Sequence, residues 1–125
     1  MKIKYLLFLC LSGLLLACED TIDPNLENGA PLLVVDAWVN NLPQTQTIKL
    51  SSTQPYFENQ LPPPLSDAQV VISDNQGNIF NFFENDDLPG SYEWYPDDLK
   101  QNLGAIGTQY QLEVVTNEQT YRAFS

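Results

Sequence analysis

The chain has 125 residues, and its sixteen acidic residues outnumber five lysines and arginines, which gives a net charge of −11. A surface this acidic repels nucleic acid and anionic lipid head groups, so both are excluded as ligands of the folded part. The sequence has no histidine, which excludes Ser-His-Asp catalysis, histidine metal sites and pH switching near neutrality.

The N-terminus has the three-part layout of a secretory signal over residues 1–17. Lys2 and Lys4 come first, an apolar stretch runs from Tyr5 to Leu16, and Ala17 supplies the small residue at the end. The apolar stretch is well short of the ~20 residues that a membrane-spanning helix needs. We therefore expect a cleaved signal peptide and not a permanent span.

The end of this signal, Leu15-Leu16-Ala17-Cys18, resembles a bacterial lipobox. The resemblance implies that Cys18 receives a diacylglycerol thioether and that cleavage then occurs between Ala17 and Cys18. Several acyl chains anchor a protein stably, whereas one holds it weakly. Cys10 leaves with the signal, so no thiol remains for a disulfide, a metal or a nucleophile. The alternative is an ordinary signal peptide followed by a cysteine without a role.

Residues 18–31 are polar and rich in turn-forming residues, which predicts a lipidated cysteine followed by a flexible tether. Glu19-Asp20 resembles the acidic signal that sends lipoproteins of Bacteroidetes-type bacteria to the cell surface. Residues 32–125 form the folded domain.

The domain consists of short β-type segments separated by turn residues, which predicts an all-β sandwich with almost no helix. The first segment is nearly continuous in apolar residues, so we expect it to be a central strand. Asp74–Asn78 and Pro89-Gly90 are expected to be turns, Pro62–Pro64 a stiff connector, and Pro96–Asn102 a possible turn of helix. The expected strands are Leu32–Val39, Gln46–Ser52, Ala68–Ile72, Ile79–Glu84, Ser91–Tyr95, Tyr110–Val114 and Tyr121–Ser125.

The order and spacing of several of these segments resemble a Bacteroidetes lipoprotein family known only as domain of unknown function forty-two forty-nine. The segments are Cys18-Glu19, Leu33–Val39, Lys49–Ser51, Ala68–Ile72, Gly90–Tyr92 and Gly107–Leu112. The resemblance implies an outer-membrane lipoprotein that works beside a TonB-dependent receptor in nutrient capture or envelope assembly. It carries over no catalytic residue. Family members continue further, so the resemblance also implies a sandwich truncated at its C-terminus, with an unpaired edge.

Two tyrosine motifs, Gly90-x-Tyr92 and Gly107-x-x-Tyr110-x-Leu112, resemble those of immunoglobulin-like and transthyretin-like sandwiches. There the glycine permits a tight turn, the tyrosine ring packs inward, and the hydroxyl holds a neighbouring loop. The resemblance implies that Tyr92 and Tyr110 act in this way.

Three kinds of chemistry remain to be weighed. The only enzymatic activity that the residue types would support is glycoside hydrolysis by a pair of carboxylates, and we expect no enzymatic activity. Asp74–Asn78 has calcium-type ligands but fits a hairpin turn better, so no metal or other cofactor is expected. The aromatic residues suggest stacking with a sugar or a peptide, at Tyr56, Phe82, Trp94 and Tyr95. The alternative for these aromatics is that both faces of the sheet are covered.

These observations lead us to expect a lipid-anchored, non-enzymatic accessory or binding module of an outer-membrane uptake system. Direct binding of a carbohydrate or peptide by exposed aromatics is the second hypothesis, and a carboxylate hydrolase is the third. The membrane, through Cys18, and a TonB-dependent receptor are the expected partners. The sequence leaves the oligomeric state open.

Overall fold

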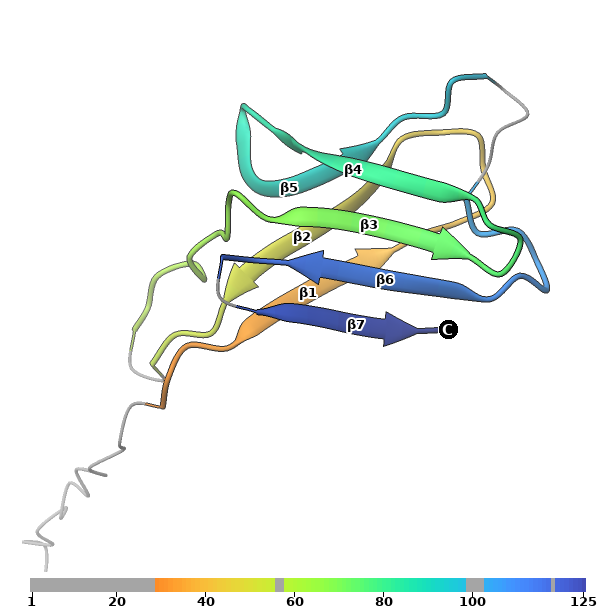
Figure 1. Cartoon of the computed structure of the whole chain (residues 1–125). Helices are drawn as coiled ribbons and strands as arrows, with labels where there is room; N and C mark the ends of the chain where they lie inside the picture. The colour runs from red at the N-terminus through yellow and green to blue at the C-terminus, as the bar shows by residue number, and fades with distance from the viewer. Residues whose placement is uncertain (1–28, 56–57, 99–102, 118) are drawn as a thin grey trace, which may run out of the picture.

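The structure is a computed structural model that describes residues 29–55, 58–98, 103–117 and 119–125 (Figure 1). All regular secondary structure among these residues is β-strand, which confirms the all-β prediction. The strands are β1 (Leu33–Trp38), β2 (Gln46–Ser52), β3 (Gln69–Asp74), β4 (Ile79–Asn85), β5 (Leu88–Trp94), β6 (Tyr110–Val115) and β7 (Thr120–Phe124). In the described part of the chain, no helix has the length and apolarity required to cross a membrane.

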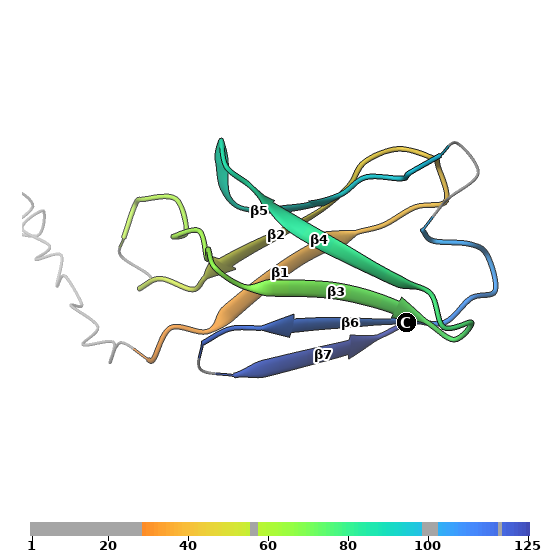
Figure 2. The same cartoon turned by 45° about the horizontal axis from the view of Figure 1, so that its top comes forward.

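The seven strands form one antiparallel sheet in the order β1-β2-β5-β4-β3-β6-β7. The sheet curls at β4, because residues 79–82 of this strand pair with β3 and residues 83–85 pair with β5. A register shift between Glu84 and Asn85 accompanies the change of partner. Figures 1 and 2 show the result, two facing layers with β1 and β7 at the two free ends. This arrangement is consistent with the expected β-sandwich.

The core lies between the layers and follows from the alternation of side chains along the strands. At its centre Phe80 of β4 and Trp94 of β5 meet edge to face, with ring centroids 5.3 Å apart and an interplanar angle of 87°. Aromatic rings prefer this geometry because the positive edge of one faces the negative face of the other. The buried apolar residues are Ile48, Leu50, Val70, Ile72, Phe80, Phe82, Tyr92, Trp94, Leu103 and Val114.

Tyr92 and Tyr110 have the roles that the resemblance implied. The Tyr92 ring is 1% exposed, and its hydroxyl donates to the Leu65 carbonyl at 3.1 Å and accepts from the Ala68 N–H at 3.0 Å. The Tyr110 hydroxyl accepts from the N–H groups of Gly104 and Ala105. Each tyrosine thus joins a strand to a loop. Burial, and then repulsion from nearby acids such as Glu84, raises the pKa of Tyr92.

The prediction that Leu32–Val39 is a central strand is wrong. The corresponding strand, β1, pairs with β2 alone in the described part of the chain and forms one edge of the sheet. Most of its side chains are exposed. A nearly continuous apolar run is typical of a strand that is buried on both faces. The position of a strand within its sheet, however, depends on pairing partners that are distant in the sequence.

The chain reverses between β4 and β5 at Asp86-Asp87, and the prediction that Pro89-Gly90 forms the turn is wrong. Asn85 and Leu88 are paired across this reversal, and the Asn85 side chain accepts a hydrogen bond from the Asp87 N–H. Pro89 and Gly90 lie inside β5. Of the possible helical turn at residues 96–102, residues 99–102 lie outside the described residues.

Candidate functional site

The outer face of the layer β1-β2-β5, continued onto β4, gathers exposed aromatic side chains. The strand registers pair Trp38 with Thr47, Thr47 with Glu93, and Glu93 with Phe83. Residues directly opposite each other on neighbouring strands point to the same side of a sheet. These four residues therefore form one row across four strands, which we call the aromatic row.

The two ends of the aromatic row are open to solvent. Trp38 is 85% exposed and Phe83 is 71% exposed. Three strand spacings separate them, which is about 14 Å in a regular sheet. That span is suited to an elongated ligand laid across the strands, with an apolar ring at each end and polar groups between.

A carboxylate lies in the middle of the row, between Trp38 and Phe83. Glu93 accepts hydrogen bonds from the Tyr95 hydroxyl and from the Asn85 side-chain amide, the latter at 3.1 Å. Both bonds lower the pKa of Glu93, and the bond from Tyr95 has the larger effect. The hydrogen bond to Glu93 in turn raises the pKa of Tyr95. Tyr95 is 58% exposed, so the row gains a third ring beside its acid.

The loop next to Trp38 is held by a buried amide. Gln46 is almost completely buried, and its side-chain oxygen accepts from the Asn40 N–H at 2.9 Å. Its NH₂ group donates to the Asn40 side chain and to the carbonyls of Leu42 and Gln44. A hollow of about 300 Å³ lies against this loop and is lined by Trp38, Asn40, Thr47 and Lys49, among others.

Further along the same face, an apolar groove of about 590 Å³ adjoins the hollow at Asp36 and Lys49. Its apolar lining includes Val34, Leu61, Pro62, Pro64, Leu88 and Pro89. The proline connector forms one wall, because Pro63 accepts from the Ser52 N–H and the Leu65 N–H donates to Leu50. Prolines have no N–H to donate, so Pro63 acts as an acceptor and Leu65 supplies the donor.

Gly90 permits the close packing at the base of this groove. Its φ is +75°, and a Cβ built there would lie 2.6 Å from the Leu50 carbonyl oxygen and 2.8 Å from the Pro64 side chain. The Gly90 N–H donates to Glu84 at 2.8 Å, and this bond is the main cause of the lowered pKa of Glu84. Only glycine combines this backbone conformation with this contact distance.

The residues that the sequence suggested for stacking fall into three groups. Phe82 and Trp94 are buried core residues, so their prediction as stacking residues is wrong. They point inward because they alternate with Phe83 and Glu93, which point outward. Tyr95 is exposed as predicted, and Tyr56 lies outside the described residues. Ala17 and Cys18, the predicted cleavage and lipid-attachment residues, also lie outside them.

The sequence interpretation missed Trp38 and Phe83 as exposed rings. Phe80-Asn81-Phe82-Phe83 contained a usable signal, since the polar Asn81 indicates the outward face and Phe83 shares it. No comparable signal marked Trp38, because its exposure results from the edge position of β1.

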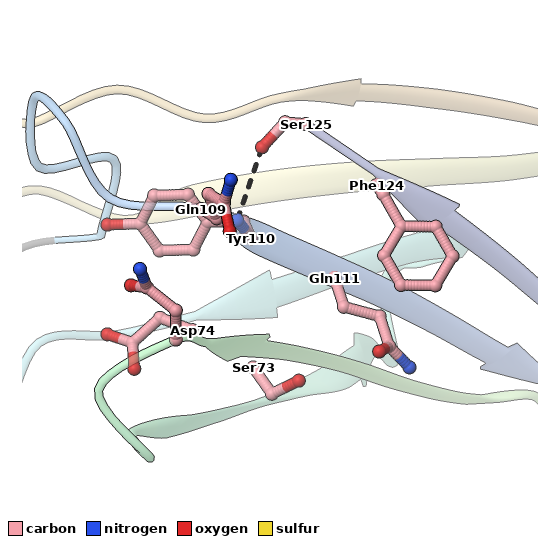
Figure 3. A pocket seen from close by; sticks show the side chains of 8 residues that line it. Ser73, Asp74, Gln109, Tyr110, Gln111, Phe124 and Ser125 are labelled. Carbon is pink, nitrogen blue, oxygen red and sulfur yellow. Dashed lines mark hydrogen bonds between the residues drawn. The ribbon is translucent and has the colours of Figure 1, made fainter.

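A separate pocket, of about 290 Å³, lies where β3 and β6 meet the residues at the end of β7 (Figure 3). Its polar groups serve the fold. The Asp74 carboxylate accepts from the N–H groups of Gln76 and Asn78 and from the Asn78 side chain, and Ser125 accepts from the Tyr110 N–H. The bonds of Asp74 confirm the predicted hairpin turn. No group of three potential metal ligands occurs among the described residues.

The family described as Domain of unknown function (DUF4249) matches residues 19–125 of the chain. The match includes the whole described sheet. No curated protein and no solved structure matches the chain.

The contact between Tyr95 and Glu93 can be tested by titration. Replacing Glu93 with Gln removes the carboxylate that opposes tyrosinate formation, so the pKa of Tyr95 is expected to fall toward its ordinary value. An ultraviolet titration of wild type, Glu93→Gln and Tyr95→Phe isolates the Tyr95 transition by difference. An unchanged transition in Glu93→Gln would show that the two side chains are not in contact.

Proposed function

We propose that this chain, which belongs to the DUF4249 family, is a lipid-anchored, non-enzymatic binding module of the bacterial cell envelope. In this proposal the lipid on Cys18 holds the β-sandwich at the outer membrane. The sandwich then acts as an accessory to a TonB-dependent uptake receptor. The family description assigns no activity, so the proposal depends on the chemistry of the chain itself.

The observation that carries the proposal is the sequence Leu15-Leu16-Ala17-Cys18 at the end of a signal-like N-terminus. A diacylglycerol thioether with a further acyl chain holds a protein at a bilayer without any spanning segment. A flexible tether then keeps the sandwich near its neighbours, so weak contacts gain from a high effective concentration.

Three carboxylates of the described residues are used by the fold itself. The pKa values of Asp74, Glu84 and Glu93 are lowered because each carboxylate accepts hydrogen bonds. Asp74 bonds the backbone of its hairpin turn, Glu84 bonds the Gly90 N–H, and Glu93 bonds the Tyr95 and Asn85 side chains. A general acid requires the opposite shift, a pKa raised toward the working pH.

Replacing Cys18 with Ser removes the sulfur that would carry the lipid. The variant is expected to lack the lipid mass and to be absent from the outer-membrane fraction, whereas wild type carries the lipid and sediments with outer membranes. Affinity purification from solubilised membranes is expected to recover a TonB-dependent receptor with the wild-type protein.

Replacing Cys10 with Ser is the matched control, because this cysteine lies within the signal and carries no lipid in the proposal. If Cys18→Ser sediments with outer membranes like Cys10→Ser, the lipid anchor is wrong. If wild type is anchored but recovers no receptor, the accessory role fails and the anchor stands.

The aromatic row favours one more candidate function, the binding of a carbohydrate. Sugar rings stack on exposed aromatic faces through their C–H surface, while their hydroxyls seek polar partners. Trp38 and Phe83 offer the rings, and Thr47 and Glu93 lie between them. A sheet face with these groups suits an extended oligosaccharide.

Titration with a panel of oligosaccharides is expected to change the fluorescence of Trp38 saturably, since Trp94 is buried and shielded from ligands. Trp38→Ala removes the fluorescent reporter together with the ring, so its binding is measured by isothermal titration calorimetry. It is expected to weaken binding about five- to tenfold, the loss of one stacking contact of about 1–1.5 kcal/mol. Phe124→Ala, which removes an equally exposed ring from the other layer, is the control. Equal affinity of the two variants would exclude the aromatic row as the site.

A further inference from the structure

The carboxylate of Glu93 has an aromatic ring on each of two sides. Phe83 lies directly opposite Glu93 on β4, and the side chains of directly opposite residues are close neighbours on one face of a sheet. Tyr95 follows two residues along the chain and donates its hydroxyl to the carboxylate. Both rings are exposed. Since β4 and β5 are interior strands of the sheet, this arrangement does not depend on a free edge.

The hydrogen bonds of Glu93 leave part of its carboxylate unused. One oxygen accepts from the Tyr95 hydroxyl, and the other accepts from the Asn85 amide. An ionised carboxylate has about four acceptor positions, so about two of them stay open. The same two bonds lower the pKa of Glu93. The carboxylate therefore keeps its negative charge at mildly acidic pH.

Glu93 has no ion-pair partner in the part of the chain that the structure describes. Arg122 is paired with Glu113 in the other layer. Lys49 lies in the next row of the same face, directly opposite Asp36, so those two opposite charges offset each other. The charge of Glu93 is therefore uncompensated within this face, and the net charge of −11 attracts cations to the molecule as a whole.

We propose that Glu93, Phe83 and Tyr95 form a subsite for the ammonium group of an amino sugar within a cationic oligosaccharide. This inference rests on the second candidate function, carbohydrate binding along the aromatic row, and specifies the class of sugar. The ammonium group would donate to the open positions of the Glu93 carboxylate. It would also lie against the rings of Phe83 and Tyr95, because the faces of aromatic rings attract cations.

The course of the aromatic row favours a sugar over a basic peptide. An extended peptide binds a sheet through the backbone of an edge strand. The row instead crosses four strands and offers side chains alone, with a ring at each end, Trp38 and Phe83. Sugar units stack on such rings, and an amino group on one of these units reaches Glu93.

The probes are a glucosamine tetramer and its fully N-acetylated counterpart, which has the same backbone and no charge. Each is titrated into the full chain in detergent micelles by isothermal titration calorimetry, at a mildly acidic pH at which the amino groups are protonated. The charged tetramer is expected to bind about fivefold more tightly than the acetylated one. This preference is expected to shrink at high salt, because salt screens exposed charges.

Charge-removing variants locate the preference. Glu93→Gln keeps the size of the side chain and is expected to abolish the preference for the charged tetramer. Glu113→Gln is the matched control, because Glu113 alternates with the buried Val114 and so faces outward from the other layer. This control removes the same charge and is expected to keep the preference.

Ring variants test the aromatic contribution. Phe83→Leu replaces an exposed ring with an aliphatic side chain and is expected to reduce the preference about twofold. Tyr95→Phe keeps the ring, removes only the hydroxyl, and is expected to retain the preference.

Four results would contradict the proposal. Equal affinity of wild type for the two tetramers would exclude the ammonium subsite and leave carbohydrate binding intact. Binding of neither tetramer would exclude the amino sugar, while the oligosaccharide panel and the membrane fractions decide separately on carbohydrate binding and the anchor. An equal loss of preference in Glu93→Gln and Glu113→Gln would attribute it to the charge of the whole protein. Tighter binding of tetralysine, lost in Glu93→Gln, would identify a basic peptide as the occupant.

Discussion

The double pairing of β4 determines the shape of this molecule. One half of the strand hydrogen-bonds to β3 and the other half to β5, so a single sheet turns over and its two halves face each other. The core is the space that this turn encloses, with Phe80 and Trp94 in contact at its centre. In the part of the chain that the structure describes, the sheet folds over without closing, so β1 and β7 are its edges. The exposed face proposed here for binding follows from that geometry.

Alternation along the strands then sorts the aromatic residues into two functions. The rings that point inward stabilise the fold, and two of them, Tyr92 and Tyr110, also use their hydroxyls to hold loops. The rings that point outward, such as Trp38 and Phe83, are exposed and lie on the surface that we propose for ligand binding. The sequence has no histidine, and we propose that its recognition chemistry lies in aromatic faces and carboxylates.

Local signals in the sequence predicted most of the strands, because alternation and turn residues act over a few positions. The bounds of β2 were predicted as observed, and the Asp74–Asn78 hairpin followed from residues that bond their own backbone. The strand order depends on contacts between distant residues, and no local pattern encodes it. This is why β1, apolar enough for a central strand, was misplaced, and why Trp38 was missed. Phe82 and Phe83 were confused because the side that faces inward is decided by the partner layer.

Residue-by-residue amide exchange of the free full chain tests the open, curled sheet most directly. The account predicts alternation along both edges, with slow exchange at Val34 and Asp36, which face β2, and fast exchange at Val35 and Ala37, which face solvent. Along β7, Tyr121 and Ala123 should exchange slowly while Arg122 and Phe124 exchange fast. Slow exchange at every residue of β1 and β7 would mean that both edges are paired, and the account of an open sheet would be contradicted.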